Sequence, residues 1–560
     1  MSAVESSWWR GAVVYQIYPR SFADSNGDGV GDLPGVTSRL EHVAALGADA
    51  VWLTPFQRSP QADHGYDVSD YLDVDPLFGT LADFDALVAR AHDLALRVIV
   101  DLVPNHCSSA HPAFQAALAA GPGSPERARF HFARGRGPGG DEPPNNWPSV
   151  FGGPAWTRVT EPDGQRGEWY LHLYAPEQPD WNWRHPATGE ILEDALRFWL
   201  DRGADGMRID VAHGLYKADG LPDLLDTRVE PMRLRGNPLA CDQEEVHEVY
   251  RRWRAIADTY EPERVLVGEV NLLPARAERY VRADELHQAF AFAFLAAPWD
   301  AESWRAAAEG LLAGAARTGS PVTWAVENHD VVRSPSRYGV GAQGRARARA
   351  ALLAVLALPG SAYLYQGQEL GLPEVDVPPQ HRQDPAWLRS GVSRDGARVP
   401  LPWTTEPAGA HGFSSRPDCS PWLPVPGDGS GAESGAESGA ESGVESGVES
   451  GVDSGVDWGE LSVQAQKDDP GSTLALTTAA LRLRRRLHRS GAVSAADQAT
   501  VHTLGDGLLV VDRLGTRLAV NMGAAPVALP PGEVLLSSGP LDSEGRLPAD
   551  TAAWLAVSER

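Results

Sequence analysis

The sequence of 560 residues is poor in cysteine, with only Cys107, Cys241 and Cys419, spaced far apart. So few and so widely spaced thiols argue against a disulfide framework and against a thiolate metal cage. Cationic side chains are also in deficit, because 49 Lys and Arg stand against 75 Asp and Glu, which leaves a net charge of −26. Nucleic acids bind clustered cations, so this balance predicts no nucleic-acid partner.

Long apolar runs are missing as well. No window reaches the roughly 18 uninterrupted apolar residues of a membrane helix, and no basic stretch followed by an apolar segment stands at the N-terminus. We therefore expect a cytoplasmic protein without a membrane partner, present as a monomer or homodimer. The hydrophobic fraction of 42% is that of a globular chain, and the length predicts about two to four domains.

What the chain does contain is an alternation of short apolar, β-branched runs with helical stretches. Each run is followed by a polar or Gly/Pro-rich loop and then by helical periodicity. The eight runs are Val13–Tyr18, Ala50–Thr54, Val98–Val103, Gly206–Val211, Val265–Val270, Gln288–Phe294, Thr323–Val326 and Ala362–Tyr365. Eight β-then-α units predict an α/β fold built on a closed (β/α)8 TIM barrel.

Two segments interrupt this regularity. The stretch after Val103 is rich in Gly, Pro and Trp and too long for one helix, so we expect a lid subdomain inserted after the third strand, over residues 107–183. Barrel segments would then cover 1–106 and 184–490. Residues 491–560, with short strands over Val501–Val557, predict a C-terminal antiparallel β-domain.

A helix is expected just before that domain, over Leu474–Leu487, with a solvated basic face that includes Arg484. Residues 428–457 hold a low-complexity repeat of Gly, Ala or Val, an acid and Ser. Such a composition buries too little apolar area to offset chain entropy, so we predict a disordered surface loop. A calcium-binding repeat is the alternative.

Charged and polar side chains follow five of the eight runs, where the barrel's carboxyl-end loops form the functional face. Arg208 and Asp210 are two residues apart on one strand, so they point to the same side. We expect the Arg208 charge to lower the pKa of Asp210, as a nucleophile requires. Glu269 follows an apolar run whose desolvation would raise its pKa, as an acid requires. Such a pair, about 5 Å apart, suits glycoside hydrolysis with retention of configuration.

Five motifs carry a resemblance to a known family. They are DLVPNH (101–106), QPDWNW (178–183), GMRIDVAH (206–213), VGEV (267–270) and ENHD (327–330). In this order they resemble the α-amylase family, glycoside hydrolase family 13, especially its α-glucosidase and oligo-1,6-glucosidase branch. The resemblance covers nearly the whole chain.

The resemblance implies roles for individual residues. Asp210 would be the nucleophile, Glu269 the acid/base, and Asp330 a third carboxylate that grips the sugar hydroxyls. The same glucose pocket would be lined by Asp101, His106, Arg208 and His329.

The branch also implies residues that close the pocket around one terminal glucose. Asp63 would bind the non-reducing O4, and Tyr66 would stack beneath the ring. An arginine from the segment Ser393–Arg398 would reach the same hydroxyls, and we prefer Arg398 to Arg394. The implied function is a retaining, exo-acting α-glucosidase acting on a small oligosaccharide such as maltose or isomaltose.

A glycine-rich loop near the N-terminus presents oxygen ligands at alternate positions, which suits a hard cation such as Ca2+ or Mg2+. Gly35 at the twelfth loop position excludes an EF-hand. In the resembling branch this loop holds a structural Ca2+ or Mg2+, and a polar turn without metal is the alternative. The implied ligands are the side chains of Asp24, Asn26, Asp28 and Asp32 and the carbonyl of Val30. No organic cofactor is expected.

Two rival functions stay open at this point. The first is a transglucosylase or isomerase of the same family, active on trehalose or sucrose, in which a sugar replaces water as the acceptor. The second is a non-catalytic sugar-binding or transporter-associated subunit, which Asp210, Glu269 and Asp330 and the missing membrane segment argue against. Val211, directly after Asp210, leans towards α-1,6 action in the resembling branch, where Ala or Thr often accompanies α-1,4 action.

Overall fold

The computed structural model describes residues 7–226, 236–427, 433–434, 457–489, 499–513 and 515–557. Its centre is an eight-stranded parallel sheet in the order β11-β10-β9-β5-β2-β1-β13-β12. A parallel bridge between Phe290 and Thr323 joins the two edges, so the sheet closes into the predicted barrel. The strands are β1 (Val13–Ile17), β2 (Ala50–Leu53), β5 (Arg97–Leu102), β9 (Gly206–Ile209), β10 (Val265–Gly268), β11 (Gln288–Ala289), β12 (Thr323–Trp324) and β13 (Ser361–Tyr365).

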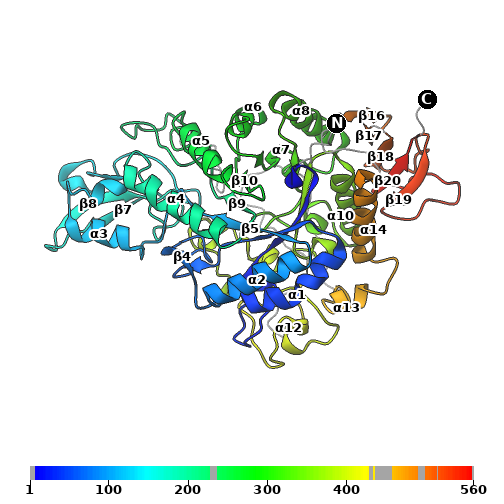
Figure 1. Ribbon diagram of the computed structural model, residues 1–560, viewed down its shortest axis with the longest axis horizontal. Helices are drawn as coiled ribbons and strands as arrows, with labels where there is room; N and C mark the ends of the chain where they lie inside the picture. The colour runs from blue at the N-terminus through cyan, green and yellow to red at the C-terminus, as the bar shows by residue number, and fades with distance from the viewer. Residues whose placement is uncertain are drawn as a thin grey trace.

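Helices surround this barrel, with α1, α2, α4, α5, α8, α10 and α14 as the long members (Figure 1). Their bounds are α1 (Leu33–Leu46), α2 (Leu81–Asp93), α4 (Pro186–Asp201), α5 (Val246–Ala257), α8 (Ala301–Thr318), α10 (Gly341–Ala357) and α14 (Thr473–Arg489). Short helices are α3 (Pro112–Ala120), α6 (Pro274–Ala277), α7 (Phe292–Leu295), α9 (Ser334–Arg337), α11 (Pro385–Ser390), α12 (Ala408–Gly412) and α13 (Val463–Gln466).

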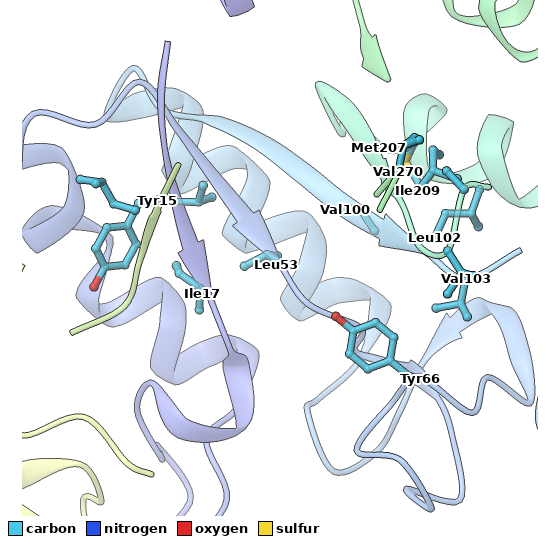
Figure 2. Close-up of a cluster of buried hydrophobic side chains, with 14 of the residues drawn as sticks. Tyr15, Ile17, Leu53, Tyr66, Val100, Leu102, Val103, Met207, Ile209 and Val270 are labelled. Atoms are coloured by element: carbon cyan, nitrogen blue, oxygen red, sulfur yellow. The ribbon is translucent and has the colours of Figure 1, made fainter. Parts of the chain in front are cut away.

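The barrel strands are apolar on both faces because one face packs inside the barrel and the other against the helices. Along β1, Val14 belongs to the interior cluster, whereas Tyr15 and Ile17 belong to the large cluster between strands and helices. Ile99 on β5 likewise lies inside while its neighbours face outward. Figure 2 shows part of the outer cluster, from Tyr15 on β1 to Ile209 on β9. This two-residue alternation decides which side chains can reach the barrel mouth.

The sixth strand is shorter than the sequence predicts. β11 ends at Ala289, and the apolar run from Phe292 onwards forms α7 instead of continuing as a strand. Phe294 and Leu295 of α7 are buried, so a short helix and a strand present the same apolar signal here.

The lid and the C-terminal domain lie at opposite ends of the long axis (Figure 1). The lid segment contains the antiparallel sheet β6-β8-β7, with β6 (Phe132–Ala133), β7 (Trp156–Thr160) and β8 (Arg166–Leu171). Small two-stranded sheets pair β3 (Gln57–Arg58) with β4 (Asp70–Val74) and β14 (Val375–Asp376) with β15 (Glu433–Ser434). The boundaries set at residues 106, 183 and 490 stay predictions.

The C-terminal domain is an antiparallel five-stranded sheet in the order β16-β17-β18-β20-β19, as predicted. Its strands are β16 (Ala499–Leu504), β17 (Leu508–Arg513), β18 (Thr516–Asn521), β19 (Glu533–Ser537) and β20 (Thr551–Ala556). The basic face of α14 is not wholly solvated, since Arg484 is buried and donates to the carbonyl of Leu358 at 2.9 Å. The repeat at 428–457 lies almost entirely outside the described residues.

Candidate active site

The inward-facing side chains change from apolar to polar towards the carboxyl ends of the strands. On β1, the next inward-facing residue after Val14 is Gln16, and on β5 the next one after Ile99 is Asp101. On β9, Arg208 stands in register with Asp101. The barrel interior is therefore a packed core at its base and a charged site at its mouth.

Backbone pairing continues past the strand ends and brings the two central carboxylates together. The Asp210 N–H donates to the carbonyl of Leu102 at 2.9 Å, and the Glu269 N–H donates to the carbonyl of Ile209 at 2.9 Å. Asp210 and Glu269 are thus extensions of neighbouring strands. The Val211 N–H donates to Oε2 of Glu269 at 3.1 Å, which orients that carboxylate.

Arg208 connects three carboxylates. Its Nη1 lies 3.0 Å from Oδ1 of Asp101 and 2.7 Å from Oδ1 of Asp210. Its Nη2 donates to Oε2 of Glu269 at 2.5 Å. The guanidinium carbon also lies 5.0 Å from the ring centre of Trp52, which supports it from the barrel interior. One cation therefore sets the positions of both carboxylates that the sequence singles out.

The pKa of Asp210 differs from the sequence-based expectation. Burial is the largest cause and raises this pKa well above its ordinary value, against the charge of Arg208, which lowers it. The charges of Glu269 and Asp101 add to the rise. The expected net lowering is wrong, because burial outweighs the Arg208 charge and because the same guanidinium also pairs with Asp101 and Glu269. Burial therefore favours the protonated form of Asp210, and the Arg208 charge favours the ionised form.

Tyr66 and His329 form a stacked pair beside Asp101. Their ring centres are 5.4 Å apart and the rings are nearly parallel, at 4°. The Tyr66 hydroxyl lies 2.8 Å from Nε2 of His329 and 3.2 Å from Oδ2 of Asp101. Burial raises the pKa of Asp101 to about 7, while Arg208 lowers it. Burial lowers the pKa of His329 to about 3, so its imidazole is neutral.

A second arginine cluster closes the other side of the site. Arg394 donates to Asp63 at 2.9 Å, to Asp330 at 3.1 Å and to Asp384 through two further bonds of 2.8 Å. Arg398 also reaches Asp330, at 2.9 Å. Burial raises the pKa of Asp330, but the charges of Arg394 and Arg398 help to hold it below its ordinary value, so this carboxylate is ionised.

These residues surround a cavity of about 270 Å³. That volume is at the small end of ligand pockets, which span about 300–1,000 Å³. Arg394 lines the cavity, whereas Arg398 is fully buried beside Asp330, and the preference for Arg398 as the residue that reaches the sugar hydroxyls stays a prediction. Of the predicted residues, the wall includes Asp63, Tyr66, His106, Asp210, Glu269, His329 and Asp330, and it excludes the buried Asp101 and Arg208.

Several wall residues were not assigned from the sequence. His213 stands within the GMRIDVAH motif, and Asn328 within ENHD, so the motifs could have indicated both. Asn271, Phe151 and Tyr174 carry no such signal, because loops from distant segments bring them to the cavity. The complete lining adds Val150, Val211, Phe292, Leu295, Ala296, Val331 and Arg394.

The predicted metal loop uses its oxygens internally. Asp24 accepts hydrogen bonds from the N–H groups of Gly27 at 2.6 Å and Gly29 at 2.9 Å. Asp32 caps the start of α1 by accepting from the Gly35 N–H. Within the part of the chain that the structure describes, no group of three or more His, Cys, Asp or Glu side chains is arranged to hold a metal ion. The cation site stays a prediction.

The remaining ligands predicted for that loop lie at its exposed edge. Asn26 and Asp28 are exposed and accept from the N–H groups of Asp28 and Val30, both at 2.9 Å. Their oxygens have the right chemistry for a hard cation, but in this arrangement they serve turn formation. Separately, no helix in the described ranges is long and apolar enough to cross a membrane.

A barrel whose strand ends gather buried carboxylates around a sugar-sized cavity is the arrangement of a glycoside hydrolase. The model of the alpha-amylase catalytic domain matches residues 16–444. The chain therefore belongs to the alpha-amylase family, in its branch of α-glucosidases and oligo-1,6-glucosidases, and is an enzyme of the glycoside hydrolase class. A domain of unknown function matches residues 496–554, the C-terminal sheet.

Relatives and solved structures agree with this placement. A probable alpha-glucosidase of Rhizobium meliloti (strain 1021) is 42% identical over 450 residues, which cover 75% of this chain and 77% of the relative. The oligo-1,6-glucosidase of Parageobacillus thermoglucosidasius is 33% identical over 466 residues, 75% of this chain and 79% of that protein.

Two solved structures superpose over nearly the whole chain. The structure of the alpha-glucosyl transfer enzyme XgtA has a TM-score of 0.82 and 35% identity, covering 98% of this chain and 100% of that chain. The trehalulose synthase MutB of Pseudomonas mesoacidophila MX-45 has a TM-score of 0.80 and 27% identity, covering 98% and 99%.

Proposed function

We propose that the protein is a retaining, exo-acting α-glucosidase that removes terminal α-linked glucose from short oligosaccharides. Asp210 attacks the anomeric carbon while Glu269 protonates the leaving oxygen, and Glu269 then activates water against the glucosyl-enzyme. The observation that carries the proposal is the placement of Asp210 and Glu269 on neighbouring strands with one guanidinium between them.

The pKa shifts of the carboxylates in the site support this chemistry. Burial and the charges of Glu269 and Asp101 raise the pKa of Asp210 and so favour a proton among these carboxylates, whereas the Arg208 charge opposes it. When a sugar displaces water, that proton is needed on Glu269 for donation, and Arg208 then stabilises the ionised Asp210. Asp330 is held ionised by Arg394 and Arg398, which suits acceptance of two sugar hydroxyls.

Exo action is supported by the closed side of the cavity. Asp63, Arg394 and Asp384 form a continuous ion-pair cluster there, and Asp63 is further held by Gln178 at 3.1 Å. A longer glucan would have to break these buried pairs to extend past the terminal hydroxyl, at a cost of several kcal/mol. A single terminal glucose instead places its hydroxyl against Asp63 and Arg394.

The test is Asp210→Asn, which keeps the size of the side chain but removes the nucleophile. We expect turnover of maltose or isomaltose to fall by about 10⁴-fold with an unchanged melting temperature. Asp201→Asn is the matched control, because Asp201 is exposed at the end of α4. Product NMR supplies the second measurement: α-glucose must form first, and initial β-glucose would overturn retention.

A transferase or isomerase is the alternative, favoured by the similarity to two solved structures, an alpha-glucosyl transfer enzyme and a trehalulose synthase. Such an enzyme passes the glucosyl group to a sugar instead of water. Product analysis over a range of maltose and sucrose concentrations separates the two. Free glucose as the main product at all concentrations supports the hydrolase, and trisaccharides or sucrose isomers support the alternative.

A further inference from the structure

A lysine is completely buried where the lid meets the barrel. Lys217, in the loop after β9, is inaccessible to solvent, and its Nζ lies 2.8 Å from Oδ2 of Asp180 in the lid motif. It also donates to Oδ1 of Asn105 at 2.8 Å and to the carbonyl of Gly214. A buried ammonium requires this many oxygen partners, because its desolvation is otherwise too costly. The cluster therefore has one stable arrangement.

This arrangement determines which way the Asn105 amide points. Its Oδ1 accepts from Lys217, and its Nδ2 donates to Oδ2 of Asp180 at 3.1 Å. Rotating the amide by half a turn would set the NH2 group against the ammonium and the oxygen against the carboxylate. Both contacts would then be repulsive, so Lys217 and Asp180 together exclude the reversed amide.

The amide orientation in turn decides the tautomer of His106. Nδ2 of Asn105 lies 3.1 Å from Nδ1 of His106, and since an amide nitrogen only donates, Nδ1 must be the acceptor. The other ring nitrogen, Nε2, lies 3.1 Å from the carbonyl of Tyr66, which only accepts. A proton on Nε2 satisfies both contacts, whereas a proton on Nδ1 satisfies neither. The amide nitrogen of Gln178 also lies 3.2 Å from Nε2 and only donates, but its hydrogens have acceptors in Oδ2 of Asp63 at 3.1 Å and the carbonyl of Tyr66 at 3.4 Å.

The His106 ring belongs to the wall of the sugar cavity. Its Nε2 side is the side of Tyr66 and Gln178, the latter of which also holds Asp63. Burial lowers the pKa of His106 to about 4, so the ring is neutral and the choice of tautomer alone decides whether this edge donates or accepts.

We propose that Asn105, locked by Lys217 and Asp180, is a positioning residue that holds His106 as the Nε2–H tautomer, whose donor to the Tyr66 carbonyl keeps His106 and Tyr66 in place against the bound sugar. Asp180 belongs to the lid. One hydrogen-bond network therefore connects the docking of the lid onto the barrel with the tautomer of His106 in the pocket. The part of the proposal that concerns sugar binding rests on the proposed glucosidase function.

The direct test is the tautomer itself, read from the ¹⁵N shifts of histidine-labelled, full-length protein. The sequence has 16 histidines, so the signal of His106 is assigned by its loss in His106→Gln. We expect the wild-type protein to carry the proton on Nε2. A proton on Nδ1 in the wild type would overturn the proposal, and this measurement requires neither activity nor a variant of Asn105.

The variant Asn105→Asp tests whether Asn105 determines the tautomer of His106. The substitution keeps the size of the side chain and its contact with Lys217 but replaces the donor shared by Asp180 and Nδ1 with an acceptor, so the proton should move to Nδ1. Because the new carboxylate also repels Asp180, the melting temperature of the variant is measured to show that it is folded. An unchanged Nε2–H tautomer would refute the role of Asn105. Asn182→Asp is the matched control, because the side chain of this lid asparagine donates to Ala128 and accepts from Arg184, which are not among the residues that line the cavity.

Kinetics then test the consequence for the sugar. With the donor to the Tyr66 carbonyl lost, Asn105→Asp should lower kcat/KM for the best α-glucoside by about tenfold or more, the effect of one lost hydrogen bond. Asn182→Asp should leave kcat/KM unchanged. A tautomer change without a loss in kcat/KM would overturn the link to sugar binding. Absence of α-glucosidase activity in the wild type would instead refute the proposed function and leave the tautomer result standing.

Discussion

Nη1 of Arg208 lies 2.7 Å from Oδ1 of Asp210, two residues further along the same chain segment. The other terminal nitrogen of the same guanidinium holds Glu269, so one planar group spans both reacting carboxylates of the proposed mechanism. Only a rigid, forked cation can make these contacts at once. The arrangement predicts that position 208 is sensitive to shape as well as to charge.

Arg208→Lys tests this directly. The substitution keeps the positive charge, but a single ammonium cannot reach Asp101, Asp210 and Glu269 together. We expect kcat/KM to fall by about 100-fold, or about 2.7 kcal/mol of transition-state stabilisation. Arg264→Lys is the control, since Arg264 is also largely buried and paired, with Asp205 at 3.0 Å, but stands at the start of β10. Equal losses in both variants would contradict a specific role for Arg208.

The acid side of the pH profile should depend on Asp63. Burial raises its pKa to about 6, and Arg394 opposes the rise. Because Asp63 must be ionised to accept from Arg394 and from sugar hydroxyls, kcat/KM should fall as the pH drops through about 6. Replacing Arg394 by Gln removes a charge that lowers this pKa, so the fall should begin at a higher pH.

The measurement for this prediction is kcat/KM against pH for the wild type and Arg394→Gln. Arg389→Gln is the control, since Arg389 contacts the carbonyls of Gly152 and Pro154 rather than a cavity carboxylate. A shift of the acid limb to lower pH in Arg394→Gln would contradict the assignment to Asp63.

The loop from Asp24 to Asp32 gives a prediction about metal removal. If it holds Ca2+ or Mg2+, saturating cation should stabilise the protein by about 2.7 kcal/mol at 100 times Kd, and EDTA should lower the melting temperature. Asp28→Ala should abolish this increment, because it removes one of the predicted ligands. The variant should stay folded, since Asp28 is exposed and its carboxylate accepts from the Val30 N–H within a turn. Equal melting temperatures with EDTA and with Ca2+ would leave the loop as a metal-free turn.

Linkage preference should depend on Val211. This residue lines the cavity beside Asp210 and adopts a φ of 43°, a backbone region that β-branched side chains rarely enter. Val211→Thr keeps the shape but replaces a methyl group at the cavity wall with a hydroxyl. We expect the ratio of kcat/KM for maltose to that for isomaltose to rise by about tenfold. Val332→Thr, on the exposed surface, should leave the ratio unchanged.

Much of the fold could be predicted because barrel strands have a strong local signal. Strands buried on both faces read as continuous apolar runs, and all eight were located correctly. The exception was the end of β11, where the apolar run of α7 looks the same in sequence. The exposure of Arg484 was predicted wrongly for a related reason. Helical periodicity does not reveal that Arg484 is buried and donates to the carbonyls of Leu356 and Leu358, which lie far away in the sequence.

Alternation along single strands also determined that Arg208 and Asp210 share a side, and motif spacing indicated which carboxylates belong to the site. The direction of the Asp210 pKa shift did not follow, because desolvation depends on everything packed around the group and on how many carboxylates share one cation. Only the tertiary structure decided that Arg394 rather than Arg398 lines the cavity, and that Lys217, Asp180 and Asn105 meet behind His106. These contacts join segments far apart in the chain, and no local pattern encodes their distances.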